Sequence, residues 1–125
     1  GSGARMKLAV NLVLGLNRAV LAEGLVFAES LGLDLATTLD VLQAGPAAST
    51  VMKTKGEKML EREFKPQARL AQHLKDVKVI LDTGLTAGAN LPMSAVHEKL
   101  LEDLVQAGNG DLHNSAIIKA FRSAE

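Results

Sequence analysis

The chain has 125 residues, enough for one domain with a single core, and its Lys and Arg balance its Asp and Glu at a net charge of +0. This balance excludes the broad basic surface that binds nucleic acid or an anionic membrane, and the absence of cysteine excludes disulfides and thiolate sites. Hydrophobic residues make up 47% of the chain but aromatic residues only 2%, a composition that favours helices over strands. We therefore expect an all-α domain.

The first predicted element is one long helix from Met6 to Leu31. Apolar residues recur through it at helical spacing and no proline interrupts it, so it should run for about seven turns. Three charged residues follow Lys7 within it, namely Arg18, Glu23 and Glu29. A helix with so little polar surface should be buried by several neighbours or by a second subunit. No apolar run approaches the roughly 20 residues that a membrane span needs, so we expect a cytoplasmic protein without one.

The next segment predicts a turn and shorter helices. Gly32 is suited to the left-handed conformation that ends a helix, and Asp34 to the N-cap of a helix that stops at Gly45. Residues 47–65 are less regular and predict two short helical pieces broken near Gly56.

The last third predicts three more helices. Residues 67–87 carry the apolar stripe of an amphipathic helix, formed by Leu70, Leu74, Val77, Leu81 and Leu85. A break follows, then a helix over 95–107, a loop at "GNGD", and a short helix over 115–124 around Ile117, Ile118 and Phe121. The chain is therefore predicted to be a single all-α domain of about six or seven helices with one long N-terminal helix.

Two polar residues near the start are candidates for chemistry. Lys7 and Asn11 are four residues apart, so they lie one above the other on one face of the first helix. An ammonium and an amide so placed could hold an oxygen-rich group, such as a hydroxyl beside a carboxylate. Taken alone, the pair is more often a solvated lysine at a frayed helix start beside an asparagine without a role.

The remaining candidates are weaker. In "HLKD", Lys75 and Asp76 point away from the apolar stripe, as an exposed pair of small energetic value would, and His73 is a lone histidine. His97 and His113 have no ligands at metal-binding spacing, so no metal site is expected. No glycine-rich phosphate loop follows a strand. From the residues alone, the chain has no self-sufficient active site.

A family resemblance changes the weight of these residues. The segments "GSGARMKLAVN", "AEGLVFAESLGLD", "LQAG", "EFKPQARLAQHLKD" and "LPMSAV", in this order, resemble the C-terminal domain of the β-hydroxyacid dehydrogenases. This group includes 3-hydroxyisobutyrate dehydrogenase, tartronate semialdehyde reductase and the glyoxylate/succinic semialdehyde reductases, with a helical domain like that of 6-phosphogluconate dehydrogenase. Its segment G-x-x-G-x-G-x-x-x-K-x-x-x-N matches here from the last two glycines onward, at Gly1, Gly3, Lys7 and Asn11. Its segment K-D-L-x-L-A appears as "KDVKVI", where only Lys75 and Asp76 match strictly.

The resemblance implies roles for the matched residues. Lys7 would be the catalytic general acid/base, exchanging a proton with the substrate oxygen as hydride moves to or from NAD or NADP. Asn11 would bind the substrate near that oxygen. Lys75 would contact substrate or cofactor from the later helix, with Asp76 beside it at the cofactor. Gly3 would belong to the substrate segment and, with Gly1, would let the chain bend where two domains meet.

The resemblance also implies an organisation for the whole protein. Residues 1–125 would be the C-terminal helical substrate-binding and dimerisation domain, without the N-terminal Rossmann domain that binds most of the cofactor, and inactive alone. The expected partners are a small hydroxyacid or semialdehyde substrate and a second copy in a homodimer, with no nucleic acid and no membrane. A non-catalytic interaction module stays open, although the intact Lys7 and Asn11 argue against it. An accidental likeness of a generic helical bundle is the least favoured alternative.

Overall fold

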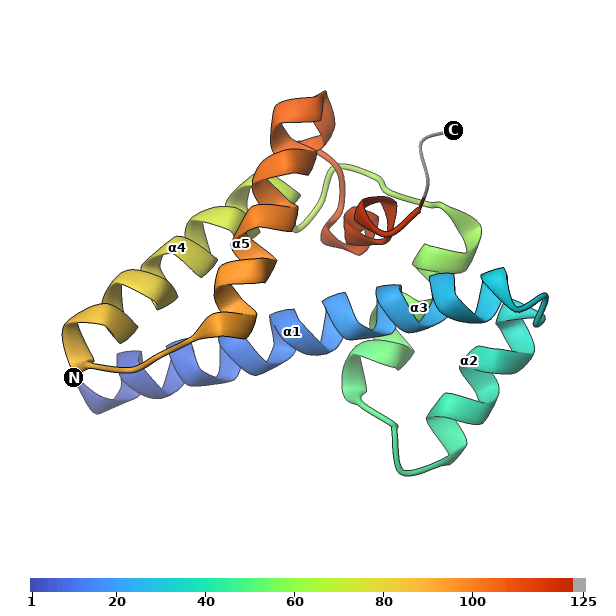
Figure 1. Ribbon diagram of the computed structural model, residues 1–125, viewed down its shortest axis with the longest axis horizontal. Helices are drawn as coiled ribbons and strands as arrows, with labels where there is room; N and C mark the ends of the chain where they lie inside the picture. The colour runs from blue at the N-terminus through green and yellow to red at the C-terminus, as the bar shows by residue number, and fades with distance from the viewer. Residues whose placement is uncertain (123–125) are drawn as a thin grey trace.

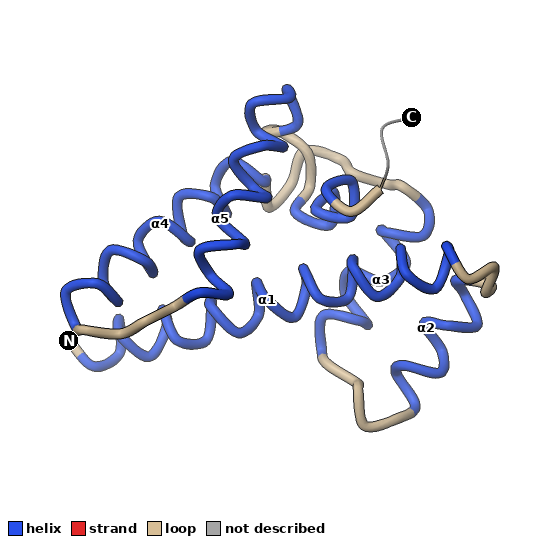
Figure 2. The backbone as a smooth tube through the Cα atoms, viewed as in Figure 1, coloured by secondary structure: helices blue, strands red, loops and turns tan. Residues whose placement is uncertain are grey.

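The computed structural model describes residues 1–122, and this part of the chain is helical without a β-strand (Figure 2). The elements are α1 (Ser2–Ser30), α2 (Leu35–Ala44), α3 (Thr50–Glu61), α4 (Leu70–Ala87), α5 (Pro92–Leu104), the π-helical turn η1 (Val105–Asn109) and the 3₁₀-helix η2 (Asn114–Ala120). The expected all-α class is confirmed. The last helix, predicted over 115–124, is a 3₁₀-helix that ends earlier, at Ala120, and residues 123–125 lie outside the described part of the chain.

The long helix α1 organises the molecule (Figure 1). Helices α4 and α5 pack against each other and cross over its N-terminal half, whereas α2 and α3 lie against its C-terminal half. The short η2 contacts α1, α3, α4 and α5 and so fills the centre between these two groups. The core consists of Ala19, Leu21, Ala22, Leu25, Leu39, Met52, Met59, Leu70, Leu74, Val77, Leu101, Leu104, Ala116, Ile117 and Ile118.

The turn from α1 to α2 follows the sequence prediction closely. Gly32 takes the left-handed conformation (φ 77°), and the backbone N–H of Leu33 donates to the carbonyl of Ala28 at 3.1 Å, which closes the helix end. The carboxylate of Asp34 then accepts the backbone N–H of Thr37 at 2.9 Å. Because this bond favours the charged carboxylate, it lowers the pKa of Asp34.

α1 also corrects an expectation about membranes. By length and composition alone it could cross a bilayer, because an 18-residue window within it has a mean hydropathy of 1.5. This is weak evidence, since the core helix of a folded domain meets the same criterion. Here α1 contacts α2, α3, α4, α5 and η2, and 33% of that window is buried.

The predicted break near Gly56 is wrong, because α3 continues through it as one helix. Gly56 is buried against α2, where an added Cβ would lie only 2.7 Å from Cδ2 of Leu39. The glycine therefore allows two helices to approach closely and does not interrupt the second one.

The apolar stripe predicted for α4 turns out to be rotated at its C-terminal end. Leu85 is 80% exposed, whereas Ile80 and Gly84 are buried in its place. Gly84 packs against Leu91, whose Cδ1 would lie 2.6 Å from an added Cβ. Because the chain folds back against Gly84, the buried face of the last turns of α4 contains Ile80 and Gly84 and not Leu85.

Several helix boundaries also differ from the prediction, and α1 begins at Ser2 and not at Met6. α4 begins at Leu70 and not at residue 67, and α5 begins at Pro92 and not at residue 95. Proline is well suited to the first turn of a helix, because that turn needs no N–H donor there.

Candidate functional site

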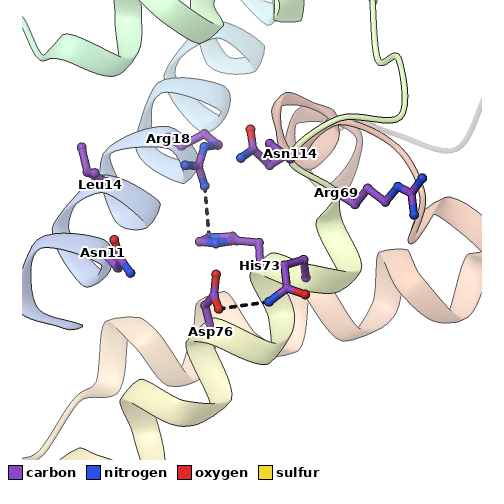
Figure 3. A pocket seen from close by; sticks show the side chains of 9 residues that line it. Asn11, Leu14, Arg18, Arg69, His73, Asp76 and Asn114 are labelled. Atoms are coloured by element: carbon purple, nitrogen blue, oxygen red, sulfur yellow. Dashed lines mark hydrogen bonds between the residues drawn. The ribbon is translucent and has the colours of Figure 1, made fainter. Parts of the chain in front are cut away.

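A pocket of about 170 Å³ opens where the middle of α1 faces the N-terminal turns of α4 (Figure 3). Its lining combines three segments that are distant in the sequence. The lining residues are Asn11, Leu14 and Arg18 from α1, Ala68, Arg69, Gln72, His73 and Asp76 from α4 and the loop before it, and Asn114 from η2.

The contribution of α1 follows from helical periodicity. Asn11, Leu14 and Arg18 are spaced three and four residues apart, so they share one face of the helix. Lys7 precedes Asn11 by one turn in the same row. Lys7, Asn11, Leu14 and Arg18 thus lie along one face of α1, and we call these four residues the polar row of α1. Leu14 is apolar, but the residues at the two ends of the row, Lys7 and Arg18, are positively charged.

Arg18 is the most buried charge of this row, with only 9% of its surface exposed. Its Nη1 donates a hydrogen bond to Nε2 of His73 at 3.1 Å. A guanidinium has no acceptor, so Nε2 of His73 must accept and the ring proton must reside on Nδ1. Burial lowers the pKa of Arg18 to about 10, which still leaves the side chain charged at neutral pH.

Two histidine rings lie next to each other near Arg18, tilted by 57°. The ring centroids of His73 and His97 are 5.1 Å apart. Burial, reinforced by the charge of Arg18, lowers the pKa of His73 to about 3 and that of His97 to about 4, so both rings are neutral at pH 7. Gly15 makes room for them, since an added Cβ would lie 2.9 Å from Nε2 of His73 and 3.1 Å from Cε1 of His97.

The charge of Arg18 is not compensated by the described part of the chain. None of the ion pairs within residues 1–122 involves it, and its Nε is buried without a hydrogen-bond partner. Oδ1 of Asn114, in the same pocket, is also buried without a partner. The positive charge of Arg18 reaches Lys55 on α3 as well, whose pKa is lowered mainly by burial and further by Arg18. The region therefore carries excess positive charge.

One carboxylate stands at the edge of this pocket. Asp76 is half-buried and accepts a hydrogen bond from Nε2 of Gln72 at 3.4 Å, one turn back on α4. Asp76 lies three positions after His73, which places both on the side of α4 that faces α1.

The structure brings together some of the residues singled out in the sequence. Asn11 and Asp76 line the same pocket from α1 and α4. Lys7 is exposed one turn before Asn11, and Lys75 is exposed and does not line the pocket. Gly3 lies inside α1 and is exposed, so the expected bend at this glycine is absent.

Three residues of the pocket were missed or undervalued by the sequence prediction. Arg18 and Asn114 were not among the candidates, and His73 was interpreted as a lone histidine. Arg18 did carry a signal, because it is the one basic residue of α1 after Lys7 and lies seven positions after Asn11. Across residues 1–122 no group of three His, Cys, Asp or Glu side chains could hold a metal ion.

The chain is similar to curated proteins over nearly its whole length. The chain is 34% identical to glyoxylate/succinic semialdehyde reductase 1 of Arabidopsis thaliana over 98% of its own length and 42% of that protein. It is 31% identical to 2-hydroxy-3-oxopropionate reductase of Escherichia coli, covering 97% of the chain and 41% of that protein. It thus spans about two fifths of the length of these curated relatives.

A solved structure shows the same fold. The crystal structure of 3-hydroxyisobutyrate dehydrogenase from Salmonella typhimurium superimposes with a TM-score of 0.92 at 24% identity, over 97% of this chain and 42% of that one. A family model described as "NAD-binding of NADP-dependent 3-hydroxyisobutyrate dehydrogenase" matches residues 1–121. The expected cofactor class, NAD or NADP, is therefore confirmed for the family. With nearly all of its residues matched, this chain belongs to the NAD-binding family of the 3-hydroxyisobutyrate dehydrogenases.

Proposed function

We propose that this chain is the helical substrate-binding domain of an NAD(P)-dependent oxidoreductase that acts on a small β-hydroxyacid or semialdehyde. A dinucleotide-binding domain elsewhere in the protein would hold most of the cofactor. The observation that carries the proposal is the polar row of α1, which runs from Lys7 through Asn11 into a polar pocket in a chain of this family. The relatives named as reductases of glyoxylate, succinic semialdehyde or 2-hydroxy-3-oxopropionate support the substrate class.

The chemistry assigned to the row is proton transfer. When bound, the nicotinamide supplies hydride to the carbonyl carbon, and Lys7 donates a proton to the carbonyl oxygen, so that a hydroxyl forms. In the reverse direction Lys7 takes that proton back. Asn11, one turn further on, donates its amide N–H to the same oxygen or to its neighbour and so fixes the oxygen beside Lys7. Because Lys7 is exposed in this domain, we propose that the second domain covers it in the assembled site.

Two of the described residues, Lys75 and Asp76, are placed to make part of the contact with the cofactor. Lys75 is an exposed cation on α4, suited to a phosphate or amide oxygen of a dinucleotide approaching from outside this domain. Asp76 faces the pocket beside it and would mark the boundary between the cofactor and substrate positions. A cradle for the whole dinucleotide needs a glycine-rich turn after a strand, and residues 1–122 contain no strand.

Substitution of Lys7 tests the catalytic assignment in the protein that contains both domains. We expect Lys7→Ala to lower kcat for glyoxylate and semialdehyde reduction by about 10²–10⁴-fold, the usual contribution of a general acid. Lys53→Ala removes another exposed lysine, on α3 and away from the pocket, and should leave kcat unchanged. Turnover that survives in Lys7→Ala would overturn the assignment.

We further propose that α1 forms a homodimer interface. Met6, Val13, Val20 and Phe27 are all exposed and recur every seven residues, which makes an apolar seam of the kind that pairs helices. Met93 and Val96 of α5 extend the seam beside Val20. A homodimer formed in the cytoplasm through this seam would bury apolar surface that is exposed in the monomer.

Sedimentation equilibrium tests the interface. The unaltered chain should sediment as a dimer, and Val20→Glu, which places a charge in the middle of the seam, should give folded monomers. Lys53→Glu is the control, because it changes an exposed charge on α3 outside the seam. A stable monomer for the unaltered chain, or a dimer that tolerates Val20→Glu, would remove the proposal.

A further inference from the structure

The pocket between α1 and α4 contains a cation that lacks its counter-ion. The side chain of Arg18 is more than nine-tenths buried, it lines the pocket, and its Nε has no partner among the described residues. In Figure 3 its guanidinium extends from α1 into the space between Asn11, His73 and Asn114. Buried charges in folded proteins are almost always paired, since an unpaired one is costly to remove from water. Arg18 is therefore prepared for an anion that comes from outside this domain.

The surroundings of Arg18 favour the same ligand. His73 is a neutral acceptor, so it orients the guanidinium without neutralising it. Arg69 lies at the rim with its guanidinium directed away from the pocket in Figure 3, and the pocket lies at the N-terminal end of α4, the positive end of the helix dipole. The one carboxylate in the lining, Asp76, accepts from Gln72 and forms no ion pair with Arg18 in residues 1–122. The pocket thus has a positive interior.

We infer that Arg18 binds a carboxylate of the substrate at the end remote from the reacting carbon, and that it thereby selects substrates by their length. A guanidinium presents parallel N–H donors that match the two oxygens of a carboxylate, which makes the pair both strong and directional. This inference rests on the proposed function, because it takes the reacting carbon to lie at Lys7 and Asn11.

The positions along α1 set the length of the ligand. Arg18 is seven residues beyond Asn11, about 10 Å along the helix axis, and its side chain leans back toward the N-terminus and so toward Asn11. Lys7 lies one turn before Asn11 on the same face, so its flexible side chain can turn toward the oxygen that Asn11 holds. A two-carbon acid such as glyoxylate, whose carboxylate adjoins the carbonyl carbon, is too short to reach Asn11 and Arg18 together. A straight chain with two or more carbons between the carbonyl carbon and the carboxylate fits better.

Asn114 adds a further requirement to the pocket. Its buried Oδ1 has no donor in the described chain. A water molecule brought in with the carboxylate, or a hydroxyl on the same ligand, would satisfy this oxygen while the carboxylate satisfies Nε of Arg18. Both unpaired atoms would then be paired in one binding event.

Binding can be measured on this chain without any turnover. With arginine side chains labelled with ¹⁵N, we expect 4-hydroxybutyrate to shift the Nε resonance of Arg18 in a saturable manner and to leave that of the exposed Arg5 in place. Calorimetry should show that Arg18→Gln binds 4-hydroxybutyrate at least about tenfold more weakly than the unaltered chain, the loss expected for a charge-assisted hydrogen bond. The affinity of Arg5→Gln should be unchanged. Arg18→Lys keeps the charge but loses the parallel N–H donors of the guanidinium, so it should bind with intermediate affinity. This variant keeps the test valid if Arg18→Gln does not fold.

Three results of this titration would overturn the inference. The first is an Nε resonance of Arg18 that does not move. The second is an equal shift with sodium chloride at the same ionic strength, which would indicate a non-specific anion site. The third is a shift with inorganic phosphate but not with 4-hydroxybutyrate, which would assign the pocket to a phosphate group and not to a carboxylate.

Kinetics of the two-domain protein test the selection by length. In Arg18→Gln the ratio of kcat/KM for succinic semialdehyde to kcat/KM for glyoxylate should fall about tenfold or more, whereas a purely structural role of Arg18 would lower both values together. An unchanged ratio would overturn the length selection. If Lys7→Ala abolishes turnover and the ratio stays unchanged, the proposed function stands and this inference fails. If 4-hydroxybutyrate binds at Arg18 but the two-domain protein reduces neither aldehyde, the proposed function fails and the carboxylate pocket stands.

Discussion

The two ends of the polar row of α1 carry the same charge in opposite environments. Lys7 is exposed on the first turns of the helix, near the far end of α4, whereas Arg18 is buried between α4 and η2 beside two neutral histidines. The helix is the same in both places, so the difference arises from what packs against it. An exposed cation is suited to a site that a second domain completes, and a buried one to a site that is already formed.

Glycines on the same helix sharpen this comparison. Gly15 is buried, and a Cβ added there would collide with His73 and His97, whereas a Cβ added at Gly3 would meet nothing within 4 Å. We therefore expect Gly15→Ala to lower the free energy of unfolding by about 1–3 kcal/mol through overpacking. Gly3→Ala should leave it unchanged or raise it slightly, because alanine favours the helix. Chemical denaturation of both variants checks this, and equal stabilities would show that the middle of α1 is not tightly packed.

The buried end should also make the fold sensitive to acid. The pKa of His73 is about 3 in the folded chain, against about 6.5 when unfolded. Between about pH 6.5 and pH 3 the unfolded chain therefore binds a proton at His73 that the folded chain does not bind. The free energy of unfolding falls as the pH falls through this range. At pH 5 this histidine alone would account for up to about 2 kcal/mol.

A variant isolates this contribution. His73→Gln removes the titration and keeps an acceptor for Arg18, so its denaturation midpoint should fall less between pH 7.5 and pH 5 than that of the unaltered chain. His97, with a pKa of about 4, and His113, with a pKa of about 4, titrate in the same direction and remain in both proteins. Parallel curves for the two proteins would mean that His73 is protonated in the folded state at pH 5.

The exposed end gives the smallest expected effect. Lys7→Met removes a solvated charge without a partner in the described chain, so the free energy of unfolding should change by less than about 0.5 kcal/mol. Thermal unfolding of the variant measures this directly. A clear loss of stability would mean that Lys7 is packed in the folded domain, and the contrast between the two ends of the row would disappear.

Local patterns predicted the parts of the fold that depend on local interactions. The long helix, its closure at Gly32 and the cap at Asp34 follow from periodicity and from hydrogen bonds within a few residues, and all three are present. The predicted break at Gly56 failed for the opposite reason. Whether a glycine ends a helix or admits a neighbour depends on that neighbour, here Leu39, and no local pattern contains this information.

The candidate site divides in the same way. Lys7 and Asn11 were identified from their spacing and from a family segment, and the structure keeps both on one helical face, whereas the sequence assigned no role to Arg18 or Asn114. An arginine among apolar residues becomes a buried cation only when α4 and η2 close over it, and an asparagine becomes an unsatisfied acceptor only when its neighbours exclude water.

The sequence by itself determined that this chain is an all-α domain built on one long helix, and which family it belongs to, because helical periodicity, caps and family segments are properties of residues near one another in the chain. Only the tertiary structure decided which charge of that helix is solvated and which is buried without a counter-ion. Desolvation depends on atoms brought together from α1, α4 and η2, more than a hundred residues apart at the extremes of the pocket, from Asn11 to Asn114.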